Sequence, residues 1–215
     1  MMALDSILVR CPLLREFHFD KMWFENLLKY VDLQINLDNH IKSIIDAEYI
    51  STNSVIEEGA TIKPPVIILD NVKILSGAYI EGPVIIGENC KVGPNCHIRK
   101  NTLLLNNVII GQGVEIKESI LSEGCVVSHF SYIGNSILGK NVNVGAGLIT
   151  SVRRFDNQQI KLRIQGKVYD TKKYKFGAVI GDNVQIGIGV LIYLGRIIKP
   201  NTTVNPGTIV KRNII

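Results

Sequence analysis

The stretch that decides the fold is VIIGENCKVGPNCHIRKNTLLLNNVIIGQGVEI, residues 84–116. An aliphatic residue recurs in it at every sixth position, at Ile86, Val92, Ile98, Leu104, Ile110 and Ile116. A period of six matches neither the helical period of 3.6 nor a plain alternating strand, so it indicates an internal repeat. Each hexad can form one short strand and one corner, and three hexads complete one turn of a triangular coil whose turns stack about 4.8 Å apart.

The repeat extends in both directions from this stretch. Upstream it reaches Ile56, which makes eleven consecutive aliphatic hexads as far as Ile116. Downstream, the spacing predicts a phase slip of four residues, after which the hexads continue at Ile120, Val126, Tyr132, Leu138 and Val144. They return in that phase at Ile180, Ile186, Ile192, Ile198, Val204 and Val210. The sequence therefore predicts 22 hexads, or roughly seven turns.

Small residues occupy repeated places within the hexads. Glycine often follows the aliphatic residue, where we expect corners with unusual dihedral angles, at Gly87, Gly93, Gly111, Gly139, Gly145, Gly181 and Gly187. Cys90 and Cys96 share one hexad position, which predicts small buried core residues. Four scattered cysteines form neither a disulfide framework nor a paired zinc motif, so we expect no metal site.

Composition indicates an ordered soluble protein. Of 215 residues, 46% are hydrophobic and 20% charged, and the net charge of +5 suits phosphate-bearing small molecules as well as nucleic acid. The sequence has no apolar stretch of eighteen residues and no secretory signal layout, so we expect no membrane span and a cytoplasmic location.

Two regions lie outside the repeat. Residues 1–52 contain two amphipathic helical segments, FDKMWFENLLKYV and LDNHIKSII, and are expected to cap the open end of a coil formed by residues 53–215. Residues 152–176 interrupt the coil, and the alternation in IKLRI followed by QGK predicts a projecting β-hairpin. Eight basic and two acidic residues give this insertion a charge of +6.

Several hexads resemble those of the left-handed β-helix acyltransferases, among them IGENCK, VGPNCH, LGKNVN, VGAGLI and IGDNVQ. The resemblance implies an all-β fold, a left-handed parallel β-helix of hexapeptide repeats with a small helical N-terminal segment. The segment SHFSYIGNSILGKNVNVGAG, residues 128–147, resembles the acetyltransferase domain of bifunctional N-acetylglucosamine-1-phosphate uridylyltransferases. Residues 152–183 are similar to the β-helix tails of archaeal and bacterial sugar-1-phosphate nucleotidylyltransferases.

The resemblance implies a set of site residues. His129 matches the family's general base, and an imidazole with a pKa near 6.5 can accept the proton that an amine loses as it attacks a thioester. Arg99 and Lys117 match residues that bind the acceptor's phosphate, and forked guanidinium and ammonium groups can replace the water that a phosphate loses. Tyr132 and Asn143 match sugar contacts.

The coenzyme contacts implied by the resemblance lie further along the chain. Ala146 matches a position where backbone groups contact coenzyme A. Because the basic insertion directly follows this turn, we expect its cations to bind the coenzyme's phosphates, at Arg153, Arg154, Lys172 and Lys173. No aromatic platform accompanies these cations, so nucleic acid is not the expected ligand.

Two positions depart from the family pattern. Val152 stands where an asparagine commonly orients the histidine, and Ile188 stands where a serine lies near the thioester. Both changes remove polar partners from the proposed reaction centre.

Two functions therefore remain open. The first is a coenzyme A-dependent sugar N-acetyltransferase that moves an acetyl group from acetyl-CoA to an amino-sugar phosphate and assembles as a homotrimer. The second is a non-catalytic β-helix module that binds a sugar nucleotide or a partner nucleotidyltransferase. The glycine-rich GxGTR-like loop of nucleotidyltransferases is absent from the sequence, so uridylyl transfer by these residues is not expected.

Overall fold

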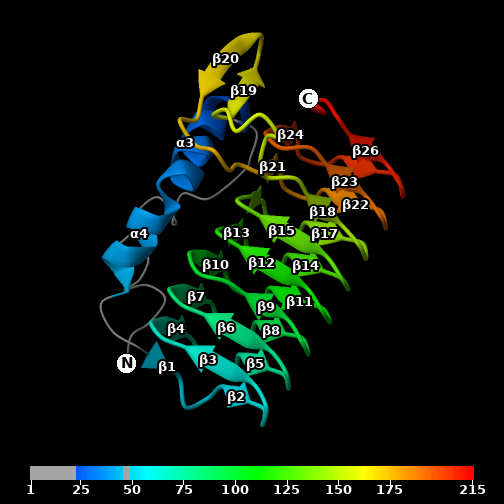
Figure 1. Cartoon of the computed structure of the whole chain (residues 1–215). Helices are drawn as coiled ribbons and strands as arrows, with labels where there is room; N and C mark the ends of the chain where they lie inside the picture. The colour runs from blue at the N-terminus through cyan, green and yellow to red at the C-terminus, as the bar shows by residue number, and fades with distance from the viewer. Residues whose placement is uncertain (1–22, 46–48) are drawn as a thin grey trace.

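The computed structural model describes residues 23–45 and 49–215. Short parallel strands wind into a triangular coil with three long faces, each of eight strands (Figure 1). The predicted fold class, an all-β left-handed parallel β-helix with a small helical N-terminal segment, is confirmed. The eight strands on each face exceed the seven turns that the hexads predicted. The difference arises partly because the coil begins at Tyr49, ahead of the first clear hexad.

We name the three faces A, B and C in the order in which the chain crosses them. Face A contains β1 (Tyr49–Ile50), β4 (Val66–Ile68), β7 (Val84–Ile86), β10 (Thr102–Leu104), β13 (Ile120–Leu121), β16 (Ile137–Leu138), β21 (Ala178–Ile180) and β24 (Arg196–Ile198). Face B contains β2 (Val55–Ile56), β5 (Lys73–Ile74), β8 (Lys91–Val92), β11 (Ile109–Ile110), β14 (Val126–Val127), β17 (Asn143–Val144), β22 (Gln185–Ile186) and β25 (Thr203–Val204). Face C contains β3 (Thr61–Lys63), β6 (Tyr79–Glu81), β9 (His97–Ile98), β12 (Glu115–Lys117), β15 (Tyr132–Gly134), β18 (Ile149–Thr150), β23 (Leu191–Ile192) and β26 (Ile209–Val210).

The core is the stack of inward-facing hexad residues, and its register corrects one sequence prediction. Ile86 pairs with Leu104, but Leu104 pairs with Leu121, so the repeat shortens from eighteen residues per turn to seventeen. The core position after Ile116 is therefore Leu121, and the predicted core positions Ile120, Val126 and Tyr132 were wrong. Because neighbouring residues of a strand point to opposite sides, those three side chains lie on the outside of the coil, and Leu121, Val127 and Ile133 lie in the core.

Both shortened turns lose their residue at the same edge, the corner between faces C and A. Core positions there are five residues apart, from Ile116 to Leu121 and from Ile133 to Leu138. Glu118 (φ 47°) and Asn135 (φ 48°) adopt the left-handed conformation in these tightened corners. Each shortened corner keeps the stack of core aliphatic residues continuous, and it shifts the core positions by one residue relative to the six-residue period.

The hexad glycines have a different role from the predicted one. Gly93, for example, lacks a positive φ, but a Cβ at Gly93 would lie 2.7 Å from the Gly111 carbonyl carbon of the next turn. Glycine is required here by the close approach of successive turns. The left-handed corner positions are instead often taken by asparagine, such as Asn95 (φ 56°) and Asn107 (φ 60°), because its short polar side chain tolerates this conformation.

The helices α3 (Trp23–Ile35) and α4 (Leu37–Ile44) confirm the two predicted helical segments, but their predicted position at the open end of the coil was wrong. Both lie along face A (Figure 1). Leu27, Val31 and Ile41 join a second buried cluster with outward-facing aliphatic residues of that face, including Ile85 and Ile120. Face A is apolar on both sides, so it needs a covering layer, whereas the open end of the coil exposes only one turn.

The insertion contains the predicted hairpin, formed by β19 (Lys161–Ile164) and β20 (Lys167–Asp170) around a turn at Gln165 and Gly166. Its alternation buries Leu162 and Ile164 against the cluster on face A and leaves the lysines and arginine outward. The insertion therefore completes the cover that the two helices begin.

Cys90, Cys96 and Cys125 are free thiols in the core, as predicted for the first two, and burial raises the pKa of Cys90 and Cys125 to about 12. No helix among the described residues is long and apolar enough to cross a membrane. Cys11, His18 and the side chain of Trp23 lie outside the described part of the chain.

Candidate functional site

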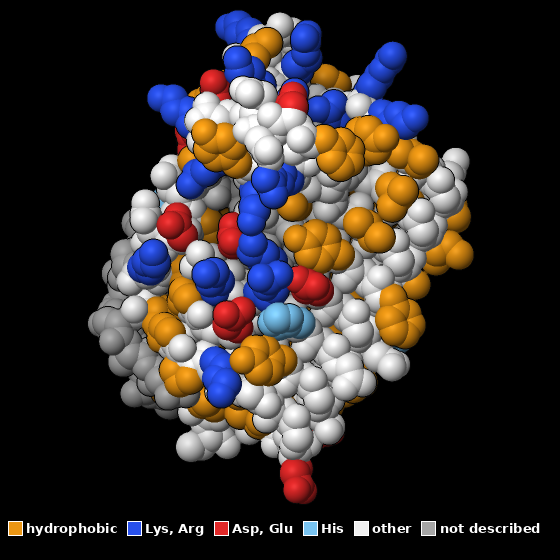
Figure 2. Space-filling model, viewed as in Figure 1, with side chains coloured by type: hydrophobic (Ala, Val, Ile, Leu, Met, Phe, Trp, Pro, Cys, Tyr) orange, Lys and Arg blue, Asp and Glu red, His pale blue; other side chains and the backbone are white. Residues whose placement is uncertain are grey.

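A strip of charged side chains runs along face C, the face turned to the viewer in Figure 2. Strands β9, β12 and β15 are adjacent in this face, and their register sets Glu115 beside Tyr132 and Lys117 beside Gly134. Arg99 directly follows β9, so Arg99, Lys117 and Tyr132 lie close together on the outside of consecutive turns. The structure thus brings together three of the predicted substrate-binding residues.

Each cation of this strip has an acidic neighbour. Arg99 donates a hydrogen bond to Glu115 over 2.8 Å, and this bond raises the pKa of the guanidinium. The Nε atom of Arg99 is buried and has no hydrogen-bond partner among the described residues. Lys117 is largely buried, and its Nζ lies 3.1 Å from Glu118 Oε1. The glutamates hold the two cations in place and leave part of their hydrogen-bonding capacity unused.

A fourth residue joins the strip, and sequence reasoning missed it. Lys175 lies near the end of the insertion, where it forms an isolated antiparallel β-bridge with Arg153 near the start of the insertion. Repulsion from Lys117, with which it is in contact, lowers the pKa of Lys175. The hexad pattern could not reveal this contact, because it stops at the insertion. Two ammonium groups held side by side are suited to an anion with two charges.

Tyr132 lies between the cations and the corner that carries His129. Its hydroxyl is partly desolvated, and burial raises its pKa, with the Glu115 carboxylate as the next cause. Tyr132 is three residues from His129 along the chain, a span of at most about 10 Å. An acceptor molecule bound over Tyr132 could therefore reach both the cations and the histidine.

His129 lies at the exposed corner between faces B and C. Its carbonyl oxygen accepts a hydrogen bond from Gly147 N over 2.9 Å, which fixes the corner, and its ring is 6.2 Å from the ring of Phe130. The imidazole has no hydrogen-bond or ion-pair partner within residues 23–45 and 49–215. His129 also lines a groove of about 360 Å³ on the face B side, together with Lys91 and Ser128.

Asn143 and Ala146 lie in the next turn of the coil. Ala146 occupies the corner position directly above His129. Asn143 belongs to β17 of face B and is exposed there, beside Val126. Within one chain, the structure therefore separates Asn143 from the predicted sugar and phosphate contacts on face C.

The two positions that depart from the family pattern lie at opposite ends of face C within one chain. Val152 is one turn above Gly134, and its Cγ1 would be 2.9 Å from a Cβ at that glycine, close to the Tyr132 hydroxyl. Ile188 occupies the corner above Ala146 and is 62% exposed. Neither side chain can offer His129 a hydrogen bond.

The four cations predicted to bind the coenzyme do not lie together. Arg153 and Arg154 line a cavity of about 530 Å³ together with Phe155. Arg153 donates a hydrogen bond to Asn157, and Arg154 forms an ion pair with Asp156. Lys173 lines a different cavity beside the helices, and Lys172 is exposed and lines neither.

The first cavity combines cations with aromatic rings. Arg196 and Lys211 add two further positive charges, and Tyr193 is half exposed beside the fully exposed Phe155. Sequence reasoning did not find Tyr193, Arg196 and Lys211, because each occupies an ordinary position of the repeat. Only the folding of the insertion against the coil brings Phe155 to them.

The coil and its cationic strip define a class, the hexapeptide-repeat β-helix proteins. The chain belongs to the family described as the GMPPB C-terminal domain, which it matches over residues 80–214. A bifunctional sugar-1-phosphate nucleotidylyltransferase/acetyltransferase of Sulfurisphaera tokodaii is 40% identical over 99 residues, which cover 46% of this chain and 25% of that protein. The bifunctional protein GlmU of Methanococcus vannielii is 41% identical over 100 residues, 46% of this chain and 24% of that protein.

The chain thus spans about a quarter of the length of these curated relatives. Among solved structures, the acetyltransferase domain of PglB from Neisseria gonorrhoeae, in complex with acetyl coenzyme A, is 15% identical. That match covers 72% of this chain and 52% of that chain with a TM-score of 0.31.

Proposed function

We propose that this chain transfers an acetyl group from acetyl-CoA to the amine of an amino-sugar phosphate, such as glucosamine 1-phosphate, in nucleotide-sugar or cell-surface glycan synthesis in the cytoplasm. The observation that carries the proposal is the group of three cations on the face beside His129: Arg99 and Lys117 lie close to Tyr132, and Lys175 contacts Lys117. Sequence similarity to two bifunctional proteins, one of them named as an acetyltransferase, supports it.

The cations would hold the acceptor by its phosphate. A phosphate dianion gives up its water on binding, and the forked guanidinium of Arg99 and the paired ammonium groups of Lys117 and Lys175 replace it. The lowered pKa of Lys175 indicates a site with excess positive charge, which an anion would relieve. The sugar ring would then lie over Tyr132, with its amine toward the corner.

At the corner, the amine nitrogen would attack the thioester carbonyl carbon. His129 would accept the proton that the nitrogen loses, and a backbone N–H near Ala146 would stabilise the oxyanion. Collapse of the tetrahedral intermediate would form the amide and break the carbon–sulfur bond. The proton on His129 would pass to the departing thiolate, which balances the reaction.

The coenzyme would lie along face C above the acceptor. Ala146 and Arg153 are seven residues apart, a span of at most about 25 Å. Ile149 and Leu191 are exposed between them and provide an apolar floor for the pantetheine arm. The cavity at Arg153 and Arg154 would then take the nucleotide end, with its phosphates on the cations and its base on Phe155.

We further propose a homotrimer, because the site is divided between two faces of one chain. Face A is covered, whereas faces B and C, which meet at the corner of His129, have no covering helix among residues 23–45 and 49–215. Packing face B of one subunit on face C of the next would close a threefold ring and bring Asn143 of one to Tyr132 of another. Apolar residues exposed around this corner support such packing, at Ile109, Phe130, Ile149, Ile188, Leu191 and Ile209.

The test is thiol release from acetyl-CoA by the purified chain, measured against a panel of amino-sugar 1-phosphates and 6-phosphates. We expect release that depends on both the amine and the phosphate of the acceptor. Release that is equal with an uncharged amino sugar would contradict the phosphate role of the strip.

One specific observation favours a second candidate, the non-catalytic module. His129 has no polar partner in the described chain, and apolar Val152 and Ile188 stand at the two positions where the resemblance implies polar residues. In that case the same strip would bind the phosphate of a sugar nucleotide, or the chain would bind a partner nucleotidyltransferase. Tight binding of a sugar nucleotide without any thiol release would support this candidate.

A further inference from the structure

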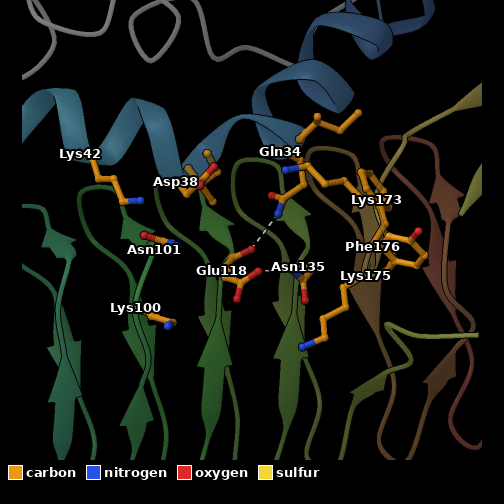
Figure 3. A pocket seen from close by; sticks show the side chains of 13 residues that line it. Gln34, Asp38, Lys42, Lys100, Asn101, Glu118, Asn135, Lys173, Lys175 and Phe176 are labelled. Carbon is orange, nitrogen blue, oxygen red and sulfur yellow. Dashed lines mark hydrogen bonds between the residues drawn. The ribbon is translucent and has the colours of Figure 1, made fainter. Parts of the chain in front are cut away.

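A separate cavity lies where the coil turns from face C to face A beneath the two helices (Figure 3). It has a volume of about 470 Å³, within the range of ordinary small-molecule sites. Three distant parts of the chain line it: the junction of α3 and α4, the coil corners, and the returning segment of the insertion. The proposed acetyl transfer uses none of its lining residues except Lys175, which lies at the boundary with the strip.

The cavity lies over the two shortened corners. Glu118 and Asn135, which occupy those corners, both line it, and Asn101 lines it from the preceding turn of full length. In Figure 3 the helices pass over these corners, and Gln34 reaches down from α3 toward Glu118. The contraction of the repeat at this edge and the covering helices together create the space.

Three amide oxygens at this cavity lack partners. Gln34 Nε2 donates to the Glu118 carbonyl oxygen over 2.7 Å, and Asn135 Nδ2 donates to Glu118 Oε2 over 2.6 Å. These bonds fix the amide orientations, so Gln34 Oε1 and Asn135 Oδ1 face elsewhere, and both are buried without a partner, as is Asn101 Oδ1. Gln34 is 7% exposed and Asn135 is 6% exposed.

Unpartnered buried acceptors are rare in folded proteins, and three around one cavity call for donors from a bound molecule. Hydroxyl groups are suitable donors, because each can donate to one amide oxygen without bringing a charge. A ligand that carries several hydroxyl groups supplies such donors.

The charges around the cavity define the rest of the ligand. Four lysines line it, against the two acidic residues Asp38 and Glu118. Glu118 is already engaged by Lys117 and Asn135, so it neutralises the lysines only in part. In Figure 3, Lys42 and Lys100 lie at the end of the cavity beside Asn101, and Lys173 and Lys175 lie at the end beside Asn135, so a pair of lysines at either end could bind an anionic group.

We propose that this cavity is a second ligand site, specific for a sugar phosphate whose hydroxyl groups donate to the amide oxygens and whose phosphate binds the lysines. Glu118 separates it from the strip on face C, since its carboxylate contacts Lys117 on one side and Asn135 on the other. The site does not depend on acetyl transfer, so thiol release can fail while this binding persists.

The experiment measures binding of glucose 1-phosphate to the full chain by calorimetry. Arg99→Met serves as the background, because it weakens the strip without touching the cavity. We expect binding to persist in this background and to weaken about tenfold or more when Lys100→Glu and Lys173→Glu are added, since one lysine at each end of the cavity becomes an anion. The matched control adds Lys73→Glu and Lys161→Glu, two exposed lysines elsewhere, and should bind within about twofold.

Loss of binding in the Arg99→Met background alone, or equal weakening by the control pair, would overturn the second site. Inorganic phosphate and glucose, titrated separately, should each bind about tenfold more weakly than glucose 1-phosphate, because each satisfies only half of the cavity. Asn101→Gly keeps the left-handed backbone at this position (φ 57°) and removes one acceptor. It should reduce the preference for glucose 1-phosphate over inorganic phosphate, and an unchanged preference would overturn the role of the amide oxygens.

Discussion

At the scale of single residues, the proposed chemistry depends on an exposed histidine. We expect His129→Ala to lower thiol release by about 100-fold or more, since general base catalysis contributes factors of this size. The free energy of unfolding should change by less than about 0.5 kcal/mol, because an exposed corner residue adds little to the core. Steady-state kinetics and chemical denaturation measure the two effects.

The matched control is Gln112→Ala, at the same corner one turn below His129, which should leave thiol release unchanged. Activity of the His129→Ala variant within about tenfold of the original chain would remove the histidine from the mechanism.

The contact of two lysines gives a second prediction at this scale. Lys117 lowers the pKa of Lys175 in the folded chain, so Lys117→Met should raise the Lys175 pKa toward its ordinary value. NMR titration of the lysine side chains above neutral pH follows this change directly. A Lys73→Met control should leave the Lys175 pKa where it is, and a Lys175 pKa that stays low without Lys117 would contradict the contact.

At the scale of elements, the register of β14 distinguishes the sequence prediction from the structure. Val127 faces the core and is fully buried, whereas Val126 lies on the outer surface of the same strand. We expect Val127→Ala to lower the free energy of unfolding by about 2 kcal/mol and Val126→Ala to lower it by much less. Denaturant unfolding of the two variants decides between the registers. A larger loss of unfolding free energy for Val126→Ala than for Val127→Ala would favour the core positions predicted from the sequence.

The insertion gives another prediction at this scale, because Arg153 and Arg154 share a cavity from which the other two predicted cations are absent. Reversing Arg153 and Arg154 to glutamate should weaken coenzyme A by about tenfold or more and dephospho-coenzyme A by less, since only the former carries the ribose phosphate. Reversing Lys161 and Arg163 on the hairpin, both exposed, is the control and should change neither affinity. Calorimetry measures both ligands, and equal weakening of the two would indicate a structural role for the arginines.

At the scale of the whole molecule, the cover on face A and the exposed apolar residues on faces B and C of the described chain predict a homotrimer. Light scattering should give three times the mass of one chain at micromolar concentration. Ile149→Glu together with Leu191→Glu should dissociate it, because these exposed residues of face C would lie in the interface. Val168→Glu, at an exposed apolar position on the hairpin, should not. The mass of a single chain, measured for the wild-type protein, would contradict the proposed site between subunits.

The sequence by itself determined the coil, because an aliphatic residue at every sixth position is buried on one side when each hexad forms one strand of a triangular stack of turns. It also determined the two helices and the hairpin, whose periods of 3.6 and 2 are local properties of the backbone. The charged residues Arg99 and Lys117 could be identified from the resemblance, and their register then brought them onto one face.

Only the tertiary structure decided how these parts meet. The phase of the core after Ile116 depends on corners that lose one residue, and neighbouring aliphatic residues such as Ile120 and Leu121 are equally apolar in sequence. The helices cover face A because that face is apolar on both sides, a property that depends on which strands become neighbours. Lys175 joins the strip, and Gln34 the cavity, through contacts between distant segments, and no local pattern can encode such contacts.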